Sequence, residues 1–128
     1  MSERDKAELE LLRTQFSEVE LRTDDLWARI PAYPLPPGLW VVSECEVAFH
    51  FPLPGQPPYG FWTRPGLTLL TGAQPNNYQY PVQTPFGDGW GQFSWAPEEP
   101  WAPGADVRRG ANMLRWVQSF TRRLAEGA

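Results

Sequence analysis

Apolar residues recur at helical spacing near the start of the chain, and charged residues occupy the positions between them. This pattern is typical of an amphipathic helix with one side against a core. It predicts a helix over residues 3–20, with Ser2 and Asp5 placed to cap its first turn. The apolar side of this helix would consist of Leu9, Leu12, Phe16 and Val19.

The clearest strand pattern runs from Trp40 to Phe51, where two sets of side chains alternate. Successive side chains of a strand point to opposite faces of a sheet, so one set should face the core. Cys45 belongs to the apolar set, and we therefore expect a structural rather than a catalytic role for it. The apolar set is Cys45, Val47, Phe49 and Phe51, and the other set is Glu44, Glu46, Ala48 and His50.

The rest of the middle region is rich in proline and tryptophan, which favours short strands and rigid loops over long helices. Leu26–Ile30, Phe61–Thr63 and Leu67–Thr71 are predicted as further strands, with a turn at 34–38 and a crossing loop at 52–58. Residues 72–104 show no clear element. We expect this segment to be ordered because it contains seven large aromatic residues: Tyr78, Tyr80, Phe86, Trp90, Phe93, Trp95 and Trp101.

The chain ends in a second helical pattern, predicted over Val107–Leu124 with Asp106 as its N-cap. The expected order is helix, antiparallel meander, long structured loop and helix, which is an α+β domain of two layers. The apolar stripe of the last helix consists of Met113, Trp116, Val117, Phe120 and Leu124.

Composition narrows the possible functions. The 128 residues fit one domain spanning 1–128. One cysteine excludes an internal disulfide, and one histidine with scattered acids offers no metal-ligand spacing, so no metal or other cofactor is expected. The net charge of −4 does not favour nucleic acid. No secretory signal and no run of about 18 apolar residues is present, so we expect a cytoplasmic protein without a membrane partner.

Charge is distributed unevenly along the chain. Residues 1–25 carry eight acids against four bases, whereas residues 107–128 carry five arginines against Glu126. Two solvated helix faces would explain this distribution, and so would an acidic helix and a basic helix that each meet a partner of opposite charge.

Three segments resemble the ubiquitin-conjugating-enzyme superfamily, in particular its diverged prokaryotic branch. Ile30–Gly38 is similar to the entry to that sheet, and Phe51–Pro58 to the proline-rich segment after its second strand. The third segment, Trp90-Gly91-Gln92-Phe93-Ser94-Trp95 followed by Trp101-Ala102-Pro103, resembles the active-site segment and the start of the next helix. The resemblance covers nearly the whole chain and implies the ubiquitin-conjugating fold.

The resemblance places Ser94 where ordinary conjugating enzymes carry the catalytic cysteine. Gly91–Trp95 aligns with their Gly-x-Ile-Cys-Leu segment, and Trp101 follows Ser94 by seven residues, close to the family's Trp-Ser-Pro spacing. The implied activity is acyl transfer of a ubiquitin-like protein, with Ser94 as a candidate acyl acceptor that would hold an oxyester.

A second family motif, His-Pro-Asn, is matched only in part. Gln74-Pro75-Asn76 resembles it, and Asn76 would then be a candidate donor to the oxyanion. The tripeptide lies 18 residues before Ser94, farther than in the family, so an insertion around Gln79–Asp88 would be needed. A plain Pro-Asn turn is the alternative.

A serine nucleophile needs a base within hydrogen-bond reach, and the sequence does not single one out. Asp88 and Glu98 flank Ser94 and are candidates, although two solvated loop acids would look the same. His50 is a further candidate, with a surface histidine as the alternative. Ser94 is therefore either an activated acceptor or an inert serine in an adaptor that binds without a covalent step.

The resemblance also implies partners: a ubiquitin-like protein, an activating enzyme and lysines of target proteins. The first helix is the usual docking surface for the activating enzyme, which makes Arg4, Lys6 and Arg13 candidate contacts. Outside this family, tryptophans among prolines could form a peptide-binding surface or, in a secreted chain, a carbohydrate-binding one. A hydrolase is disfavoured because the segment around Ser94 lacks the second glycine of a Gly-x-Ser-x-Gly elbow.

Overall fold

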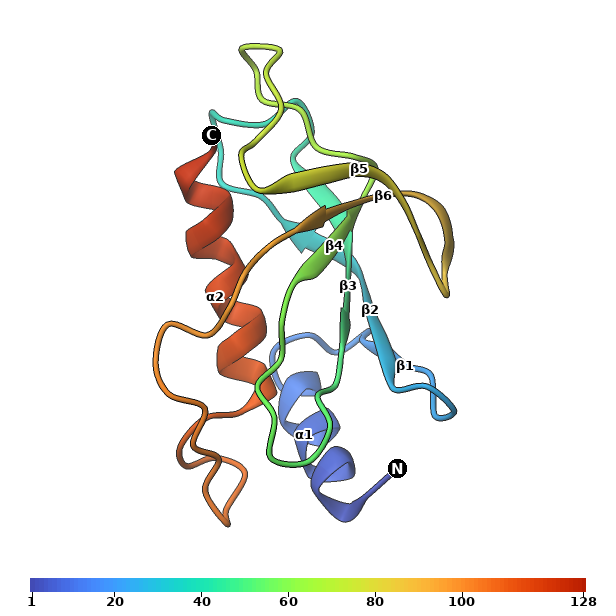
Figure 1. Cartoon of the computed structure of the whole chain (residues 1–128), viewed down its shortest axis with the longest axis vertical. Coiled ribbons are helices and arrows are strands. Elements are labelled where there is room, and N and C mark those ends of the chain that lie inside the picture. Colours follow the sequence, from blue (N-terminus) through green and yellow to red (C-terminus); the bar gives the residue numbers. More distant parts are fainter.

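The computed structural model describes residues 1–128, which form two helices and six strands. The order along the chain can be followed in Figure 1. The elements are α1 Glu3–Arg13, β1 Glu20–Leu21, β2 Trp27–Pro34, β3 Glu44–His50, β4 Phe61–Arg64, β5 Tyr78–Thr84, β6 Gly87–Phe93 and α2 Met113–Glu126. Neither helix is both long and apolar enough to cross a membrane.

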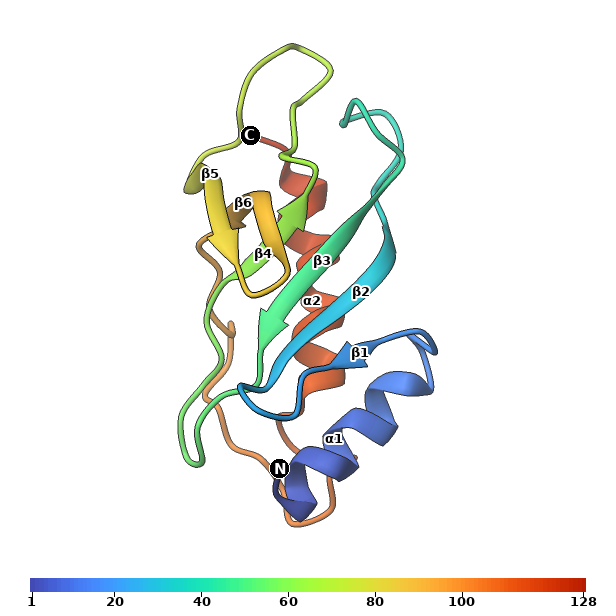
Figure 2. The same ribbon diagram turned by 90° about the vertical axis from the view of Figure 1, so that its right-hand side faces the viewer.

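All six strands belong to one antiparallel sheet in the order β1-β2-β3-β4-β6-β5. Helix α2 lies along one face of this sheet, which we call the inner face, and α1 lies beside the N-terminal half of α2 (Figures 1 and 2). The predicted α+β class is therefore confirmed.

The core fills the space between α2 and the inner face. Its centre is a stack in which the Phe120 ring of α2 lies 4.1 Å from that of Phe61, which in turn lies 4.9 Å from Phe93. Burying such rings supplies much of the driving force for folding. The predicted stripe of α2 is confirmed, because Met113, Trp116, Val117, Phe120 and Leu124 are all buried.

Helix α1 begins as predicted but is shorter. Ser2 and Asp5 form a capping box, in which each side chain accepts from the other residue's backbone N–H. The helix ends at Arg13, so the prediction that it reaches residue 20 is wrong. Beyond it the chain turns so that Phe16 stacks on Tyr33 and Glu20–Leu21 can pair with β2. Phe16 and Val19 continue the helical spacing of apolar residues in the sequence only because they also pack against the core.

The central strand is confirmed over Glu44–His50 but is shorter than the predicted Trp40–Phe51, and Cys45 is only 4% exposed on the inner face. The predicted strand at 26–30 corresponds to β2, which runs farther, to Pro34. The strand expected at 67–71 is absent, since only Leu69 forms a bridge, to Trp40.

The expectation that 72–104 lacks an element is wrong, because this segment contains the β5–β6 hairpin. Thr84 pairs with Gly87, and the Thr84 hydroxyl accepts from the Phe86 N–H in the turn. The amino-acid composition of β5 explains why the sequence pattern did not predict the hairpin. β5 is an edge strand that contains a proline and is largely exposed, so it shows little apolar alternation.

The start of α2 also differs from the prediction. Its N-cap is Asn112, whose side-chain oxygen accepts from the Arg115 N–H. Asp106 instead accepts from the N–H of Arg108 in a local turn. Gly110, at φ +70°, separates this turn from the helix in a conformation that favours glycine.

The other face of the sheet, the outer face, is held together by charge. The Glu46 carboxylate on β3 lies 2.7 Å from the Arg29 guanidinium of β2 and 2.8 Å from that of Arg64 on β4. The hairpin adds aromatic cover, with the Trp90 ring 4.6 Å and the Phe86 ring 5.9 Å from the guanidinium carbons of Arg64 and Arg29. Figure 2 views this face, with α2 behind the sheet.

Candidate functional site

Ser94 directly follows the last residue of β6 and is exposed. Its backbone N–H donates to the Asn77 carbonyl at 3.0 Å, which extends the pairing of β5 with β6 by one residue. Its hydroxyl makes no hydrogen bond within the protein, so it is free to meet a partner molecule. The same N–H, being already bonded, is not available to an oxyanion.

The β5–β6 hairpin brings the two separated motifs together. The hairpin runs from Tyr78 to Phe93 and includes the predicted insertion around Gln79–Asp88, and its two ends place Asn77 opposite Ser94. Asn76 lies one residue earlier and is exposed, with no hydrogen bond from its side-chain amide inside the protein. Asn77 has φ +52°, a left-handed conformation that asparagine adopts more readily than most residues. The long sequence separation is therefore compatible with a joint site.

Helix α2 holds the segment that follows Ser94 and the segment that lies opposite Ser94 at the base of the hairpin. Three of its residues contribute, each spaced to lie on the same side of the helix. Ser119 accepts from the Trp95 indole N–H at 3.0 Å. Arg122 pairs with Glu98 at 2.8 Å, and Arg123 donates to the Asn76 carbonyl at 2.6 Å. Ser94 thus lies between anchored neighbours.

Arg123 is the least expected of these three anchors, since it is only 4% exposed. Its second nitrogen donates to the Gly127 carbonyl at 3.2 Å, and its guanidinium lies 4.9 Å from the Phe93 ring centre. The nearest carboxylate, that of the exposed Glu126, is 3.9 Å away. Burial lowers the pKa of Arg123, and Glu126 raises it in part.

Neither predicted acid is placed to activate Ser94. Asp88 lies in the turn end of the hairpin, six residues and therefore roughly 20 Å along the strand from Ser94. Glu98 is nearer in sequence, but its carboxylate is bound by Arg122.

His50 is no better placed as a base. It ends β3, and β4 lies between that strand and β6. Two strand spacings put it at least about 10 Å from Ser94, beyond hydrogen-bond reach. Its ring instead packs edge-on against Trp27, with centroids 5.6 Å apart. None of these three groups forms a hydrogen bond with the Ser94 hydroxyl.

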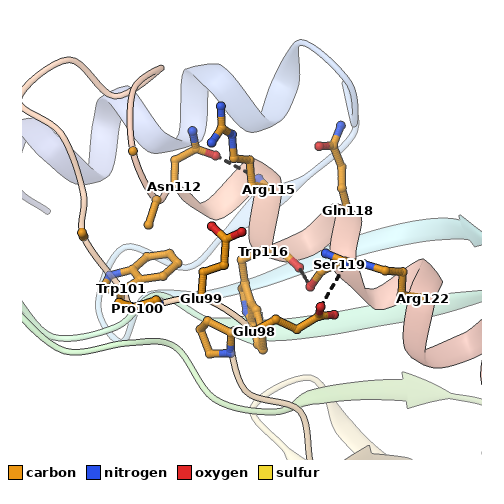
Figure 3. Close-up of a pocket in the computed structure, with 14 residues that line it drawn as sticks. Glu98, Glu99, Pro100, Trp101, Asn112, Arg115, Trp116, Gln118, Ser119 and Arg122 are labelled. Atoms are coloured by element: carbon orange, nitrogen blue, oxygen red, sulfur yellow. Dashed lines mark hydrogen bonds and ion pairs between the residues drawn. The ribbon is translucent and has the colours of Figure 1, made fainter.

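A groove begins three residues after Ser94, between the segment 97–102 and α2 (Figure 3). Its volume is about 580 Å³. Arg122 and Glu98 form an ion pair at its edge, whereas Glu99 and Arg115 have no ion-pair partner. The buried Trp116, whose indole N–H lacks a hydrogen-bond partner, also lines the groove. The exposed charges of Glu99 and Arg115 are thus available to a bound molecule, whereas the Trp116 N–H is buried beneath the groove surface.

The motif glycine and the aromatic residues around Ser94 have structural explanations. A side chain at Gly91 would overlap the Tyr78 ring, so this glycine is needed for packing of β5 on β6. Phe93 belongs to the core, Trp90 to the outer face, and Trp95 is tied to α2.

The three candidate contacts on α1 differ in availability. Arg4 is engaged inside the molecule, where its guanidinium donates to the Gly104 and Ala111 carbonyls. Lys6 is exposed and pairs only with the exposed Glu3. Arg13 is exposed too, although its guanidinium donates to the Val19 carbonyl. Arg4 therefore links α1 to the segment before α2.

The only cysteine is not part of this site. Burial raises the pKa of the Cys45 thiol to about 12, with smaller contributions from Glu46 and Glu44. The thiol is therefore protonated at neutral pH and unreactive. No cluster of three or more histidine, cysteine, aspartate or glutamate side chains is arranged to hold a metal ion.

The sequence reasoning missed the groove and the α2 anchors Ser119, Arg122 and Arg123. The spacing of these residues to one side of the last helix was the available signal, but it looked like an ordinary polar face.

Comparisons of the chain with protein-family models, with curated proteins and with solved structures found no match.

Proposed function

We propose that this protein is a ubiquitin-conjugating-enzyme-like protein that receives or positions a ubiquitin-like protein delivered by an activating enzyme. The observation that carries the proposal is the meeting of Ser94 with the Asn76–Asn77 segment at the base of the β5–β6 hairpin. The order of a helix, antiparallel strands, the Ser94 segment and a helix supports the ubiquitin-conjugating fold.

The proposed reaction is acyl transfer through Ser94. The hydroxyl oxygen attacks the activated C-terminal carbonyl carbon of the ubiquitin-like protein, an ester bond forms, and the activating enzyme's leaving group departs with its electron pair. The hydroxyl proton passes to a base on the partner, because no side chain of this protein accepts a hydrogen bond from Ser94. A lysine amine of the target then attacks the ester, and the Ser94 hydroxyl is restored.

The Asn76 side-chain amide is the candidate donor to the oxyanion in both steps. Asn76 is exposed, directly precedes the residue whose carbonyl accepts from the Ser94 N–H, and its amide has no hydrogen-bond partner. The Ser94 N–H is bonded to Asn77 and does not serve as this donor, so the oxyanion needs another one such as the Asn76 amide.

A second function is a non-covalent adaptor that binds the ubiquitin-like protein or the activating enzyme. The observation that favours it is the absence of a general base near Ser94, with Glu98 bound to Arg122 and Asp88 at the far end of the hairpin.

Intact-mass spectrometry distinguishes the two functions. The protein is mixed with the ubiquitin-like protein, the activating enzyme and ATP, with Ser94→Ala as the matched variant. An adduct that alkali removes and that Ser94→Ala does not form establishes the oxyester. A stable complex on gel filtration without any adduct establishes the adaptor. If neither an adduct nor a complex is observed, the proposal is rejected.

The docking of the activating enzyme is tested separately on α1. Lys6→Glu combined with Arg13→Glu reverses the charge of its two exposed basic contacts and should weaken the pull-down of the activating enzyme. Unchanged binding would remove α1 from the interface.

A further inference from the structure

Arg123 carries a charge at a buried position that an apolar side chain could also fill. The surrounding core is apolar, and the only carboxylate near it is exposed and 3.9 Å away. Burying a guanidinium without a close counterion is costly, and an apolar side chain of similar volume is often no less stable at such a site. The hydrogen bonds of Arg123 therefore indicate what it does.

One of these bonds leads to the Ser94 segment. Arg123 binds the carbonyl of Asn76, the peptide that joins Asn76 to Asn77 is planar, and the Asn77 carbonyl in turn accepts from the Ser94 N–H. Asn77 holds this course in a left-handed conformation, with φ +52°. A single guanidinium thus restrains the short path from α2 to Ser94.

We propose that Arg123 is a positioning residue for the Ser94 site, which holds the Asn76–Asn77 segment against Ser94 and aligns the Asn76 amide with it. The assignment of a reaction to this site rests on the function proposed above, but the restraint itself does not. Arginine suits the role because its planar fork donates in two directions at once, to Asn76 and to Gly127.

The competing explanation is that Arg123 serves only as a C-terminal cap for α2 through its bond to Gly127. A cap would steady residues 124–127, with no effect on Ser94. The two roles therefore differ in which backbone N–H groups they protect.

Amide hydrogen exchange of the full chain separates the two roles. Arg123→Met keeps much of the side-chain volume and the contact with Phe93 but removes every donor. We expect exchange at the Ser94 N–H to accelerate about fivefold, since losing a restraint worth roughly 1 kcal/mol changes the opening equilibrium by that factor. Arg115→Met, on the same helix, removes an exposed guanidinium that has no ion-pair partner and is the matched control.

Acceleration at Ser94 in Arg123→Met and not in Arg115→Met supports the positioning role. Acceleration confined to residues 124–127, or none at all, overturns it. If Arg123→Met does not fold, Arg123→Lys is measured instead, because it keeps the charge while losing the fork. Partial acceleration at Ser94 is then the expected result, and wild-type exchange there overturns the role.

The effect on the proposed reaction is measured by adduct formation. Arg123→Met should form the Ser94 adduct about tenfold more slowly, because misaligned reacting groups lose part of their effective concentration. Methylguanidinium added to Arg123→Ala should restore part of the rate. If the wild-type protein forms no adduct, the proposed function fails and the exchange result still judges Arg123. If the wild-type forms it and Arg123→Met matches that rate, the positioning role fails alone.

Discussion

The two faces of the sheet are stabilised in different ways. On the inner face, rings from β4, β6 and α2 stack at 4–5 Å and exclude water. On the outer face, Glu46 bridges two arginines, and the hairpin covers them with aromatic rings. Inner-face contacts depend on apolar area and hardly on salt, whereas the partly exposed outer-face pairs are screened by ions.

This difference bears on where the site lies. Ser94 is the first residue after the end of β6, where the chain leaves the sheet, so it belongs to neither face. Its neighbours Phe93 and Trp95 are anchored to the core and to α2, while the residue itself stays exposed. A rigid support beneath an exposed side chain is the arrangement that a positioned reactive group needs.

The largest expected effect comes from opening the inner face. Phe120→Ala removes the ring that lies 4.1 Å from Phe61 and should lower the free energy of unfolding by about 3–5 kcal/mol. Phe86→Ala, on the half-buried outer side, should cost about 1–2 kcal/mol. Urea unfolding at low and high salt measures both. Equal losses would contradict the view that the inner face carries most of the stability.

The inner face is also what the sequence predicted best. Its strands and α2 repeat apolar residues with periods of two and 3.6, and both periods survive in the fold. The end of α1 could not be read in this way, because Phe16 and Val19 reach the core through a turn instead of a helix. Periodicity records which residues are buried, and the backbone path between them is a separate question.

The residues buried on the inner side are mainly apolar, and one carboxylate is the main exception. Glu8 of α1 accepts from the Met113 N–H at the start of α2, and it lies 3.7 Å from Arg4. Burial raises the pKa of Glu8 to about 7, against smaller lowering effects of Arg4 and the Met113 N–H. A carboxyl with a pKa raised on folding stabilises the protein when protonated, and this contribution is lost as pH rises through the folded pKa.

The free energy of unfolding should therefore fall by on the order of 2–3 kcal/mol as pH rises from about 5 to above 7. Glu8→Gln should lose this dependence and be more stable than the wild type at alkaline pH, since its amide oxygen can still accept from Met113. Glu10→Gln, exposed on the same helix, is the control and should keep the wild-type slope. Identical slopes in all three proteins would show that Glu8 does not titrate in this range.

The site was predicted only in part, for a physical reason. Ser94 and Asn76 were named from local motifs, but the hairpin that joins them depends on glycines and an edge strand with little apolar alternation. The hydrogen bonds of Arg122 and Arg123 link residues 24 and 47 positions apart. No short-range pattern encodes such pairs, since Arg122, Arg123 and Glu98 each resemble an ordinary surface charge and the Asn76 carbonyl is ordinary backbone.

The smallest expected effect tests the outer face directly. Glu46→Gln removes the charge between Arg29 and Arg64, whose side chains are about a quarter exposed. It leaves two guanidinium groups facing each other and should lower the free energy of unfolding by about 1 kcal/mol at low salt. High salt screens the new repulsion, so the difference from wild type should shrink. Glu44→Gln, exposed on the same strand, should change little at either salt concentration. A loss at Glu46 that stays constant with salt would mean that the outer face, like the inner one, depends on packing.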